Sequence, residues 1–289
     1  MNKMNNATNN ALNNAMNNAI KDDNDIQHFD DEGQGKERHF VTALARGLEL
    51  LRCFGANERE IGISELARRS GIPKPTVARL AATLASLGYL EHLEAQGKYR
   101  LGAGVLSLGY ALLSRLDVRE VARPLMRELA ERTQASVSLA VRDRLSMVYV
   151  ESVRSSASIT LQRGVGTRLS LATSAIGRAY LAGLPAADRA FLLDQLRLRD
   201  EDHWPALQAG IEQGLRDHAE HGFCISIGEW DKDTCGVGVP FCAPDGMMMS
   251  FNCGMPAFKC TREYLQDKVG PALVELVRKV GGSMGRIAP

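Results

Sequence analysis

The chain has 289 residues, 45% of them hydrophobic, which is enough for two domains with apolar cores. It contains no run of eighteen apolar residues and no secretory signal, so we expect a cytoplasmic protein without a membrane span. The net charge of +1 is unevenly spread, because residues 1–37 hold three basic and seven acidic side chains whereas residues 38–101 hold ten and six. The basic excess of the second segment favours a nucleic-acid partner.

Residues 1–37 have low complexity. Residues 5–20 repeat Asn-Asn-Ala four times, each copy followed by one variable residue, and an acidic run extends from Asp22 to Glu32. Polar repeats of this kind bury too little apolar surface to offset the entropy lost on folding. We therefore expect residues 1–37 to form a disordered tail.

The basic segment begins with a predicted helix over residues 40–54 and continues into two short helices joined by a turn, residues 63–80. The apolar side of the first helix comprises Leu44, Leu48, Leu51 and Phe54, with Ala43 and Leu50 beside them. In the two-helix unit, Ser64 is placed to cap the first helix, and Gly71 can adopt the left-handed conformation that ends it. Pro73 or Pro75 can start the second helix, because its first turn needs no N–H there.

The second helix of this unit carries polar residues near its start, away from its apolar face. That face consists of Val77, Leu80, Ala81 and Leu84. Lys74, Thr76 and Arg79 lie off it, which is the pattern of a helix-turn-helix whose second helix enters the major groove of DNA. A cation and a hydroxyl near a helix start suit phosphate, and Arg79 can reach a guanine edge. The alternative is an ordinary helical hairpin with solvated Lys and Arg.

An alternating segment follows and predicts a short hairpin. Residues 89–93 and 98–101 are the predicted strands, and Ala95-Gln96-Gly97 is the turn between them. A hairpin directly after a recognition helix is a wing, and Lys98 and Arg100 on it are placed to touch phosphate or the minor groove. The candidate DNA-binding residues are Ser64, Lys74, Pro75, Thr76, Arg79, Lys98 and Arg100.

Residues 102–116 predict a helix with a broad apolar face. The face comprises Leu106, Leu108, Leu112, Leu113 and Leu116. A helix between two domains needs a surface against which to bury such a face, and a partner subunit is the natural place. The alternative is that the helix packs on its own domain.

The rest of the chain predicts an α+β domain. Helices are expected over residues 118–134, 186–197, 204–221 and 261–280. Strands are expected over residues 136–141, 146–153, 158–163, 223–228, 236–242 and 247–253. Two groups of strands with helices between them are typical of this architecture.

Motifs for catalysis or phosphate binding do not occur, so we expect no enzyme activity, no cofactor and no metal. Two alternatives stay open. Cys253 with a histidine would make a thiol-dependent small-molecule enzyme. A zinc or redox sensor would instead use the carboxy-terminal cysteines, with His218, His221, Cys224 and Cys235 as zinc ligands. The six cysteines are otherwise expected to be reduced and buried.

Several segments taken together resemble the IclR family of bacterial transcriptional regulators. These are residues 43–51, the 63–80 unit, Leu87-Gly88-Tyr89-Leu90 and Tyr99-Arg100-Leu101-Gly102, and the similarity extends over about residues 40–285. The resemblance implies a winged helix-turn-helix at 38–101, a linker helix at 102–117, and an effector-binding α+β domain with a curved antiparallel sheet at 118–289. It also implies a homodimer, sometimes a tetramer, that binds double-stranded operator DNA and a small-molecule effector. We interpret the chain as a ligand-responsive regulator of a catabolic operon.

By this resemblance the effector pocket lies between a loop and the inner face of the sheet. Ala175 and Ile176 are expected at the loop, where a helix N-terminus with Thr173 and Ser174 can hold a carboxylate or simply be capped. The other residues expected at or near the pocket are Leu161, Ser226, Gly236, Phe251 and Cys253. Glu229 and Asp231 are expected either to orient effector hydroxyls or to be solvated.

Two departures from the family pattern bear on the effector. The usual Ser-x-Ser-Gly-Pro is replaced by residues 251–256, Phe-Asn-Cys-Gly-Met-Pro, with one residue inserted, so Asn252 is an alternative inward residue. Gly236 stands where the family has a small polar residue, which predicts more room. Phe251 and Met247–Met249 make the predicted site apolar. We therefore expect an acidic effector with an aromatic or apolar body.

Overall fold

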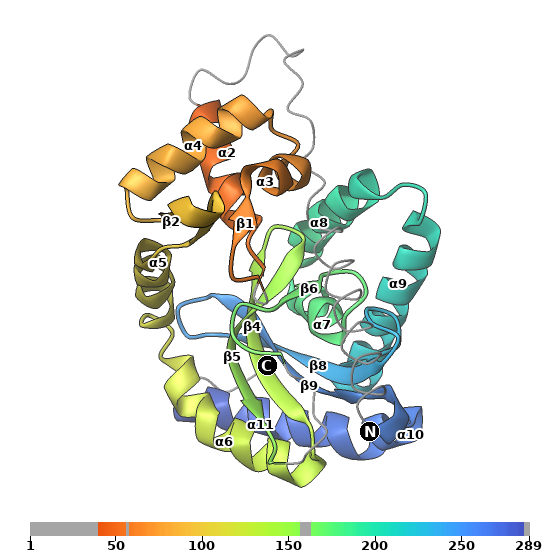
Figure 1. The fold of residues 1–289 in the computed structure, drawn as a ribbon. Coiled ribbons are helices and arrows are strands. Elements are labelled where there is room, and N and C mark those ends of the chain that lie inside the picture. The colour runs from red at the N-terminus through yellow and green to blue at the C-terminus, as the bar shows by residue number, and fades with distance from the viewer. Residues whose placement is uncertain (1–39, 56–57, 157–162, 286–289) are drawn as a thin grey trace, which may run out of the picture. The chain divides into compact units, whose positions relative to one another are not determined.

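The computed structural model describes residues 40–55, 58–156 and 163–285, and the predicted tail of residues 1–37 lies outside them. The chain divides into two compact units, of which the first ends at Arg115 and the second begins at Leu116 (Figure 1). Within the described ranges, no helix combines the length and the apolar character needed to cross a bilayer.

The first unit is a winged helix-turn-helix with one helix appended. Its elements are α2 (Thr42–Arg52), β1 (Ile61–Gly62), α3 (Ile63–Ser70), α4 (Lys74–Ser86), β2 (Leu90–Leu93), β3 (Lys98–Leu101) and α5 (Ala103–Leu113). The strands form an antiparallel sheet in the order β1-β3-β2, and the turn Glu94–Gln96 joins β2 to β3. The predicted hairpin is confirmed. Strand β1 was not predicted, because two residues are too few to show an alternation.

The turn between α3 and α4 forms for the predicted reasons, but the predicted helix cap is wrong. Gly71 has φ 66° and ends α3, and Pro73 precedes α4 in an extended conformation. Helix α3 begins at Ile63 with Gly62 as its N-cap, so Ser64 lies exposed inside the first turn and caps nothing. The boundary shifts because Gly62 pairs with Lys98 of β3, which holds the backbone extended up to the helix.

The core of the first unit excludes part of the face predicted for α2. Leu50 is fully buried, but Leu44 and Leu48 are 62% and 51% exposed. Helix α2 turns Gly47 and Leu50 inward instead. Leu51 and Phe54 of the predicted stripe do pack against this core, so only its first half is exposed.

Helix α5 exists as predicted, and none of its residues is buried in the single chain. Its start is tied to the wing, since the N–H of Gly102 donates to the carbonyl oxygen of Tyr89 at 2.8 Å. Leu106 is 75% exposed, and Leu108, Tyr110 and Leu112 are also largely exposed. The helix therefore presents an uncovered apolar surface.

The second unit contains one antiparallel sheet and eight helical segments among its described residues, including a 3-10 turn at Ala257–Lys259. Its helices are α6 (Val118–Thr133), α7 (Ala175–Gly183), α8 (Ala186–Arg199), α9 (Trp204–His221), α10 (Arg262–Tyr264), a π-helical turn at Leu265–Val269 and α11 (Gly270–Ser283). Its strands are β4 (Ser136–Asp143), β5 (Ser146–Arg154), β6 (Arg168–Ser170), β7 (Cys224–Ile227), β8 (Thr234–Cys242) and β9 (Met248–Pro256). Nearly all of the strand predicted at 158–163 lies outside the described residues.

The six strands form a curved sheet in the order β6-β5-β4-β9-β8-β7. Helices α6 and α11 pack against one face, and α7 packs against the other with α9 beside it (Figure 1). Helix α7 lies unusually close to β8, because a Cβ atom on Gly238 would fall 2.3 Å from the carbonyl oxygen of Ala175. A glycine at 238 thus lets the N-terminus of α7 rest directly on the sheet.

Candidate functional site

The start of helix α4 presents its polar residues to solvent. Lys74, Pro75 and Arg79 are exposed and Thr76 is half-buried, while Val77 and Ala81 are fully buried on the opposite side. No ion pair is recorded for Lys74 or Arg79 among the described residues. Both cations are therefore available to an anionic partner.

The wing cations are paired within the first unit. The ammonium group of Lys98 lies 2.7 Å from a carboxylate oxygen of Glu60, and Nε of Arg100 donates to Glu91 across the hairpin at 2.7 Å. Both arginine and lysine remain about half exposed. Neighbouring carboxylates thus lower the net positive charge that the wing presents.

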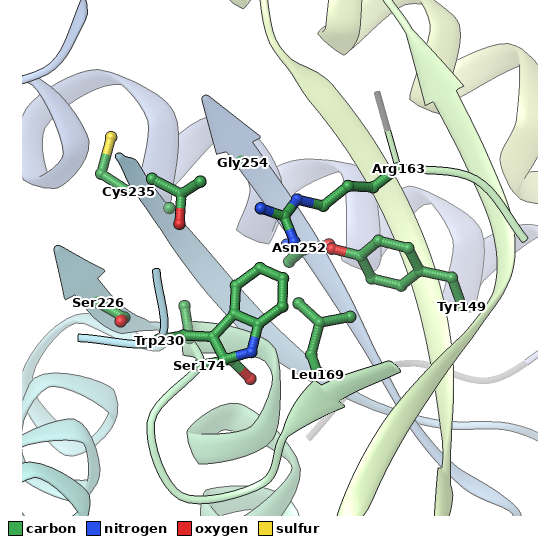
Figure 2. Close-up of a pocket in the computed structure, with 12 residues that line it drawn as sticks. Tyr149, Arg163, Leu169, Ser174, Ser226, Trp230, Cys235, Asn252 and Gly254 are labelled. Carbon is green, nitrogen blue, oxygen red and sulfur yellow. The ribbon is translucent and has the colours of Figure 1, made fainter. Parts of the chain in front are cut away.

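A cavity opens in the second unit between the sheet and the N-terminus of α7 (Figure 2). It encloses about 370 Å³, part of which is open to solvent. Its lining residues are Tyr149, Arg163, Leu169, Ser174, Ala175, Ser226, Trp230, Thr234, Cys235, Gly236, Asn252 and Gly254. They come from every strand of the second unit except β4, from the first residue of α7, and from the segments that precede β6, α7 and β8.

One end of the cavity is the N-terminus of α7. Ser174 caps this helix, because its Oγ accepts a hydrogen bond from the N–H of Gly177 at 3.1 Å. The N–H groups of Ala175 and Ile176 lie in the first helical turn, where the backbone has no intrahelical acceptors for them. Ser226 fixes the preceding loop, since its hydroxyl donates to the carbonyl oxygen of Thr173 at 2.8 Å. The capping role expected for Ser174 is therefore the one that its side chain fills.

Tyr149 and Asn252 supply polar groups to the lining. Asn252 is only 7% exposed, and no hydrogen-bond partner is recorded for its Oδ1 among the described residues. Burial raises the pKa of Tyr149, and this effect outweighs the lowering caused by hydrogen bonds with Asn252 and Ser138. The phenol therefore stays protonated at neutral pH. A buried amide oxygen without a donor is costly, so Asn252 is an unusual residue in this wall.

Arg163 and Trp230 form a third part of the lining. The guanidinium of Arg163 lies 4.1 Å from the centre of the Trp230 ring and pairs with Asp231 at 2.5 Å. Glu229 pairs with Arg178, which is 2% exposed. Both carboxylates that were expected to face either effector or solvent are therefore engaged by arginines. The intervening Trp230 is the residue that reaches the cavity.

The structure brings together three of the seven predicted pocket residues. Ala175, Ser226 and Gly236 line the cavity. Ile176 does not, because its side chain packs into the core with Leu171 and Leu181. Leu161 lies outside the described residues.

The prediction that Phe251 and Cys253 line the cavity is wrong, and the alternative, Asn252, lies there instead. In the register of β9, Phe251 pairs with Leu139 and Cys253 pairs with Val137, whereas Asn252 pairs with Ser138. The apolar positions of neighbouring strands share one face, on which Cys253 meets Thr133 of α6 at 3.6 Å. Strand β9 must turn the same way as its neighbours, so its polar residue faces the cavity.

Gly236 lines the cavity for a reason other than the predicted one. A Cβ atom there would lie 2.7 Å from the carbonyl oxygen of Cys253. The glycine therefore allows close approach of β8 and β9 and is not simply a source of extra room. The sequence did not predict Tyr149 or Trp230 as lining residues. It did single out Glu229 and Asp231, the two neighbours of Trp230.

The described cysteines bear differently on the alternatives that depended on them. Within the described residues no group of three His, Cys, Asp or Glu side chains could hold a metal ion, so the predicted zinc set does not assemble. Burial raises the pKa of Cys253 to about 12, which keeps its thiol protonated and unreactive at neutral pH. Cys235 and Cys260 are joined by a disulfide bond, which corrects the expectation that every cysteine is reduced.

A winged helix-turn-helix followed by an α+β unit with a small-molecule cavity defines a transcriptional regulator with separate DNA-binding and effector-binding domains. The model of the bacterial transcriptional regulator IclR C-terminal domain matches residues 110–281, and that of the IclR helix-turn-helix domain matches residues 43–94. The chain belongs to the IclR family.

Individual relatives agree with this assignment. The HTH-type transcriptional regulator TsaQ1/TsaQ2 of Comamonas testosteroni is 33% identical over 263 residues, covering 90% of this chain and 94% of the relative. An IclR family regulator from Brucella abortus is 46% identical, with a TM-score of 0.78 over 86% of this chain and 95% of that one. An IclR homologue from Microbacterium hydrocarbonoxydans, solved with 4-hydroxybenzoate, shares the fold with a TM-score of 0.63, 21% identity and coverage of 84% and 99%.

Proposed function

We propose that this regulator binds a palindromic operator as a homodimer, and that an acid with an aromatic or apolar body is its effector. The observation that carries the proposal is the lining of the cavity, which combines a helix N-terminus, apolar side chains and an unpartnered amide oxygen. We further propose that the protein acts in the cytoplasm without catalysis. The operon it controls is then a catabolic one that consumes or forms the acid.

The N-terminus of α7 is the proposed carboxylate site. Backbone N–H groups and the helix dipole both favour an anion there. Helix α7 has nine residues and rests on the sheet through Gly238, so its position is rigid. A carboxylate at Ala175 would receive hydrogen bonds that the protein itself leaves open.

The apolar residues of the cavity wall differ from those that the sequence predicted, but they favour an effector with an apolar body as well. Phe251 points away from the cavity, and the Met247–Met249 run does not line it. Leu169, Trp230 and the ring of Tyr149 supply the apolar wall instead. Flat aromatic surfaces of this kind favour a planar ligand by offset or edge-to-face stacking.

Asn252 adds a requirement for a hydrogen-bond donor on the ligand. Its Oδ1 can only accept, so a hydroxyl or N–H group on the effector would satisfy it. A site built for such a group discriminates strongly against the analogue that lacks it, because the protein atom is then left unpaired. A hydroxylated aromatic acid meets all the conditions of the cavity.

We expect Asn252→Leu to remove this discrimination. Wild-type protein should bind 4-hydroxybenzoate more tightly than benzoate, and the variant should reduce that ratio about tenfold because the unpaired amide oxygen is gone. Calorimetric titration of both acids into both proteins gives the ratio. The exposed amide of Gln208 on α9 provides the matched control, Gln208→Leu, which should leave the ratio unchanged. Equal wild-type affinity for the two acids, or binding of pyruvate alone, would contradict the proposed effector class.

Operator binding is tested with DNA selected from a random library and measured by fluorescence anisotropy. Acids that bind only the folded protein must raise its melting temperature, which identifies ligands without knowledge of the operon. A ligand found in this way should change operator affinity by no more than its differential affinity for the two states of the protein. An acid that binds tightly and leaves operator affinity unchanged would refute the effector role.

Arg79→Ala should weaken operator binding about tenfold and relax base preference at one position, because an arginine fork reads guanine through two hydrogen bonds. Lys74→Ala should weaken binding to all sequences alike, since a lysine near a helix start contacts phosphate. The exposed Arg127 of α6 gives the control Arg127→Ala, which should bind as wild type. Equal weakening of Arg79→Ala on operator and random DNA would show that Arg79 contacts only phosphate.

Glu91→Gln should strengthen binding to any DNA by about three- to tenfold at low salt. The change keeps the shape of residue 91 but removes the carboxylate that pairs with Arg100, which frees one cation for phosphate. The slope of log affinity against log salt concentration should become steeper by about one, which is the change expected for one added phosphate contact. If the slope and affinity stay unchanged, the wing does not touch DNA through Arg100.

A further inference from the structure

The cavity wall contains one half of a cysteine pair. Cys235 of β8 is 4% exposed and lines the cavity beside Gly236. Its partner, Cys260, is half-buried in the loop that precedes α10 and does not line the cavity. The bond between them ties the start of β8 to a loop 25 residues later in the chain. A covalent change at Cys260 is therefore transmitted directly to the cavity.

The remaining described cysteines are poorly suited to thiol chemistry. Cys53, Cys224 and Cys253 are buried, and burial raises the pKa of each thiol. A thiol must ionise to react with an oxidant, so these three are protected. Cys242 is half-buried at the far end of β8. In the Cys235–Cys260 pair, the half-buried Cys260 is the member that an oxidant can reach, and the buried Cys235 needs to react only with the Cys260 sulfur.

We propose that Cys235 and Cys260 are a reversible oxidation site that couples the redox state of the cell to the cavity. The oxidant class is a hydroperoxide. The Cys260 thiolate attacks a peroxide oxygen, the O–O bond breaks, and a sulfenic acid forms with release of water or an alcohol. The Cys235 thiol then attacks the Cys260 sulfur, the S–O bond breaks, and the hydroxyl leaves as water with the thiol proton while the disulfide forms. Two thiols lose two electrons in total, and the peroxide gains them.

The geometry gives the direction of the effect on the cavity. In the disulfide, the sulfur of Cys235 points away from Trp230 and Arg163 (Figure 2). Reduction frees this side chain to turn about its Cα–Cβ bond toward the space that a ligand would occupy. It also removes the link that holds the start of β8, so the wall is less preorganised. The oxidised form therefore binds the effector more tightly than the reduced form, a consequence that rests on the proposed function.

The first experiment identifies the pair in the full chain. The protein is reduced, exposed to graded hydrogen peroxide, alkylated, and analysed by peptide mass spectrometry. We expect Cys235 and Cys260 to lose alkylation together, and to regain it after treatment with dithiothreitol. Cys260→Ser should abolish this protection, whereas Cys242→Ser should leave it unchanged. Protection of a different cysteine, or none in the folded wild type, would overturn the inference.

The second experiment measures the cavity and does not require a known effector. Trp230 lies in the lining, so its fluorescence in a Trp204→Phe background reports on the wall near Cys235. Emission should shift between the oxidised and reduced forms of wild type and of Cys242→Ser, and Cys260→Ser should be fixed at the reduced value. Identical emission in the two wild-type forms would refute coupling to the cavity.

Titration of 4-hydroxybenzoate then separates the two proposals. We expect about three- to tenfold tighter binding to the oxidised form, the range that preorganisation of one wall supplies. Equal affinity, or tighter binding to the reduced form, would refute the redox effect while the effector proposal stands. If no acid of the panel binds either form, the effector proposal fails, and the alkylation and fluorescence results still decide the oxidation site.

Discussion

Replacing Leu106 by glutamate is expected to convert the proposed dimer to a monomer and to weaken operator binding about 100-fold or more, the gain that two linked half-site contacts supply. Leu106 is 75% exposed in the single chain, and no residue of α5 is buried. A helix this apolar needs a cover, and the second copy of the same chain is the proposed one. Sedimentation at micromolar concentration measures the assembly, and anisotropy measures operator binding.

The electrostatics of the first unit point in the same direction. The segment 38–101 has a modest basic excess, and Glu60 and Glu91 already pair two of its cations. One winged unit therefore offers few phosphate contacts, and two units on a palindrome would double them. Loss of the dimer should accordingly reduce the salt dependence of operator binding by about half.

Leu198→Glu on α8 is the matched control for Leu106→Glu. Leu198 is 54% exposed and lies in the second unit, so the same change of charge and size tests surface hydrophobicity alone. Leu198→Glu should leave the proposed dimer and the operator affinity as in wild type. If a tetramer forms through α8, this variant should dissociate it to dimers. A dimer that persists in Leu106→Glu would show that α5 is not the interface.

Replacing Arg178 by methionine is expected to lower the free energy of unfolding of the second unit by about 3 kcal/mol, within the range measured for broken buried networks. Arg178 is 2% exposed, and its guanidinium donates to the carbonyl oxygen of Ala172 at 2.9 Å and to Glu229 at 2.8 Å. Methionine fills part of the space but leaves that carbonyl oxygen without its donor. Because Glu229 is 43% exposed, water can hydrate it after the change, which limits the loss.

Two glycines of α9 make room for the Arg178 side chain. A Cβ atom on Gly210 would lie 2.2 Å from an Arg178 nitrogen, and one on Gly214 would lie 2.9 Å from its Cδ. The two glycines are four residues apart on α9, so they open one face of that helix for the arginine. The side chain then reaches the loop before α7, where it holds Ala172 near the proposed carboxylate site. Arg178 is therefore a positioning residue for the cavity.

Urea denaturation and effector titration together test this role. Glu229→Gln should destabilise the unit by a similar amount, because it leaves the buried guanidinium without its counter-charge. The exposed Arg216 of α9 provides the control Arg216→Met, for which the change should stay within about 0.5 kcal/mol. If Arg178→Met retained wild-type stability and affinity for the acid, Arg178 would hold neither the fold nor the loop.

Local features of the sequence predicted much of the fold. Helix α9 has the predicted bounds, Trp204–His221, because an apolar period ends at Gly222, which has φ 82°. Gly71 and Pro73 similarly set the turn before the proposed recognition helix. These elements depend on residues within one or two helical turns of each other, so a single sequence contains the whole signal.

Features of the cavity depend on residues far apart in the chain and were harder to predict. Alternation along β9 separated Phe251 and Cys253 from Asn252, but it did not say which set faces the cavity. That choice follows from pairing with β4 more than a hundred residues earlier, where Val137 and Leu139 face the helices. The same limit explains Leu44, whose exposure depends on where α3 and α4 pack.

The sequence by itself determined the order of the elements, the turns, the basic winged unit and the family. Only the tertiary structure decided the cap at Gly62, the pairing of the wing cations, the inward face of β9 and the joining of Cys235 to Cys260. The physical reason is the distance along the chain over which each interaction acts. Backbone propensity and apolar period act over a few residues, whereas ion pairs, strand register and disulfides depend on which distant segments the fold brings together.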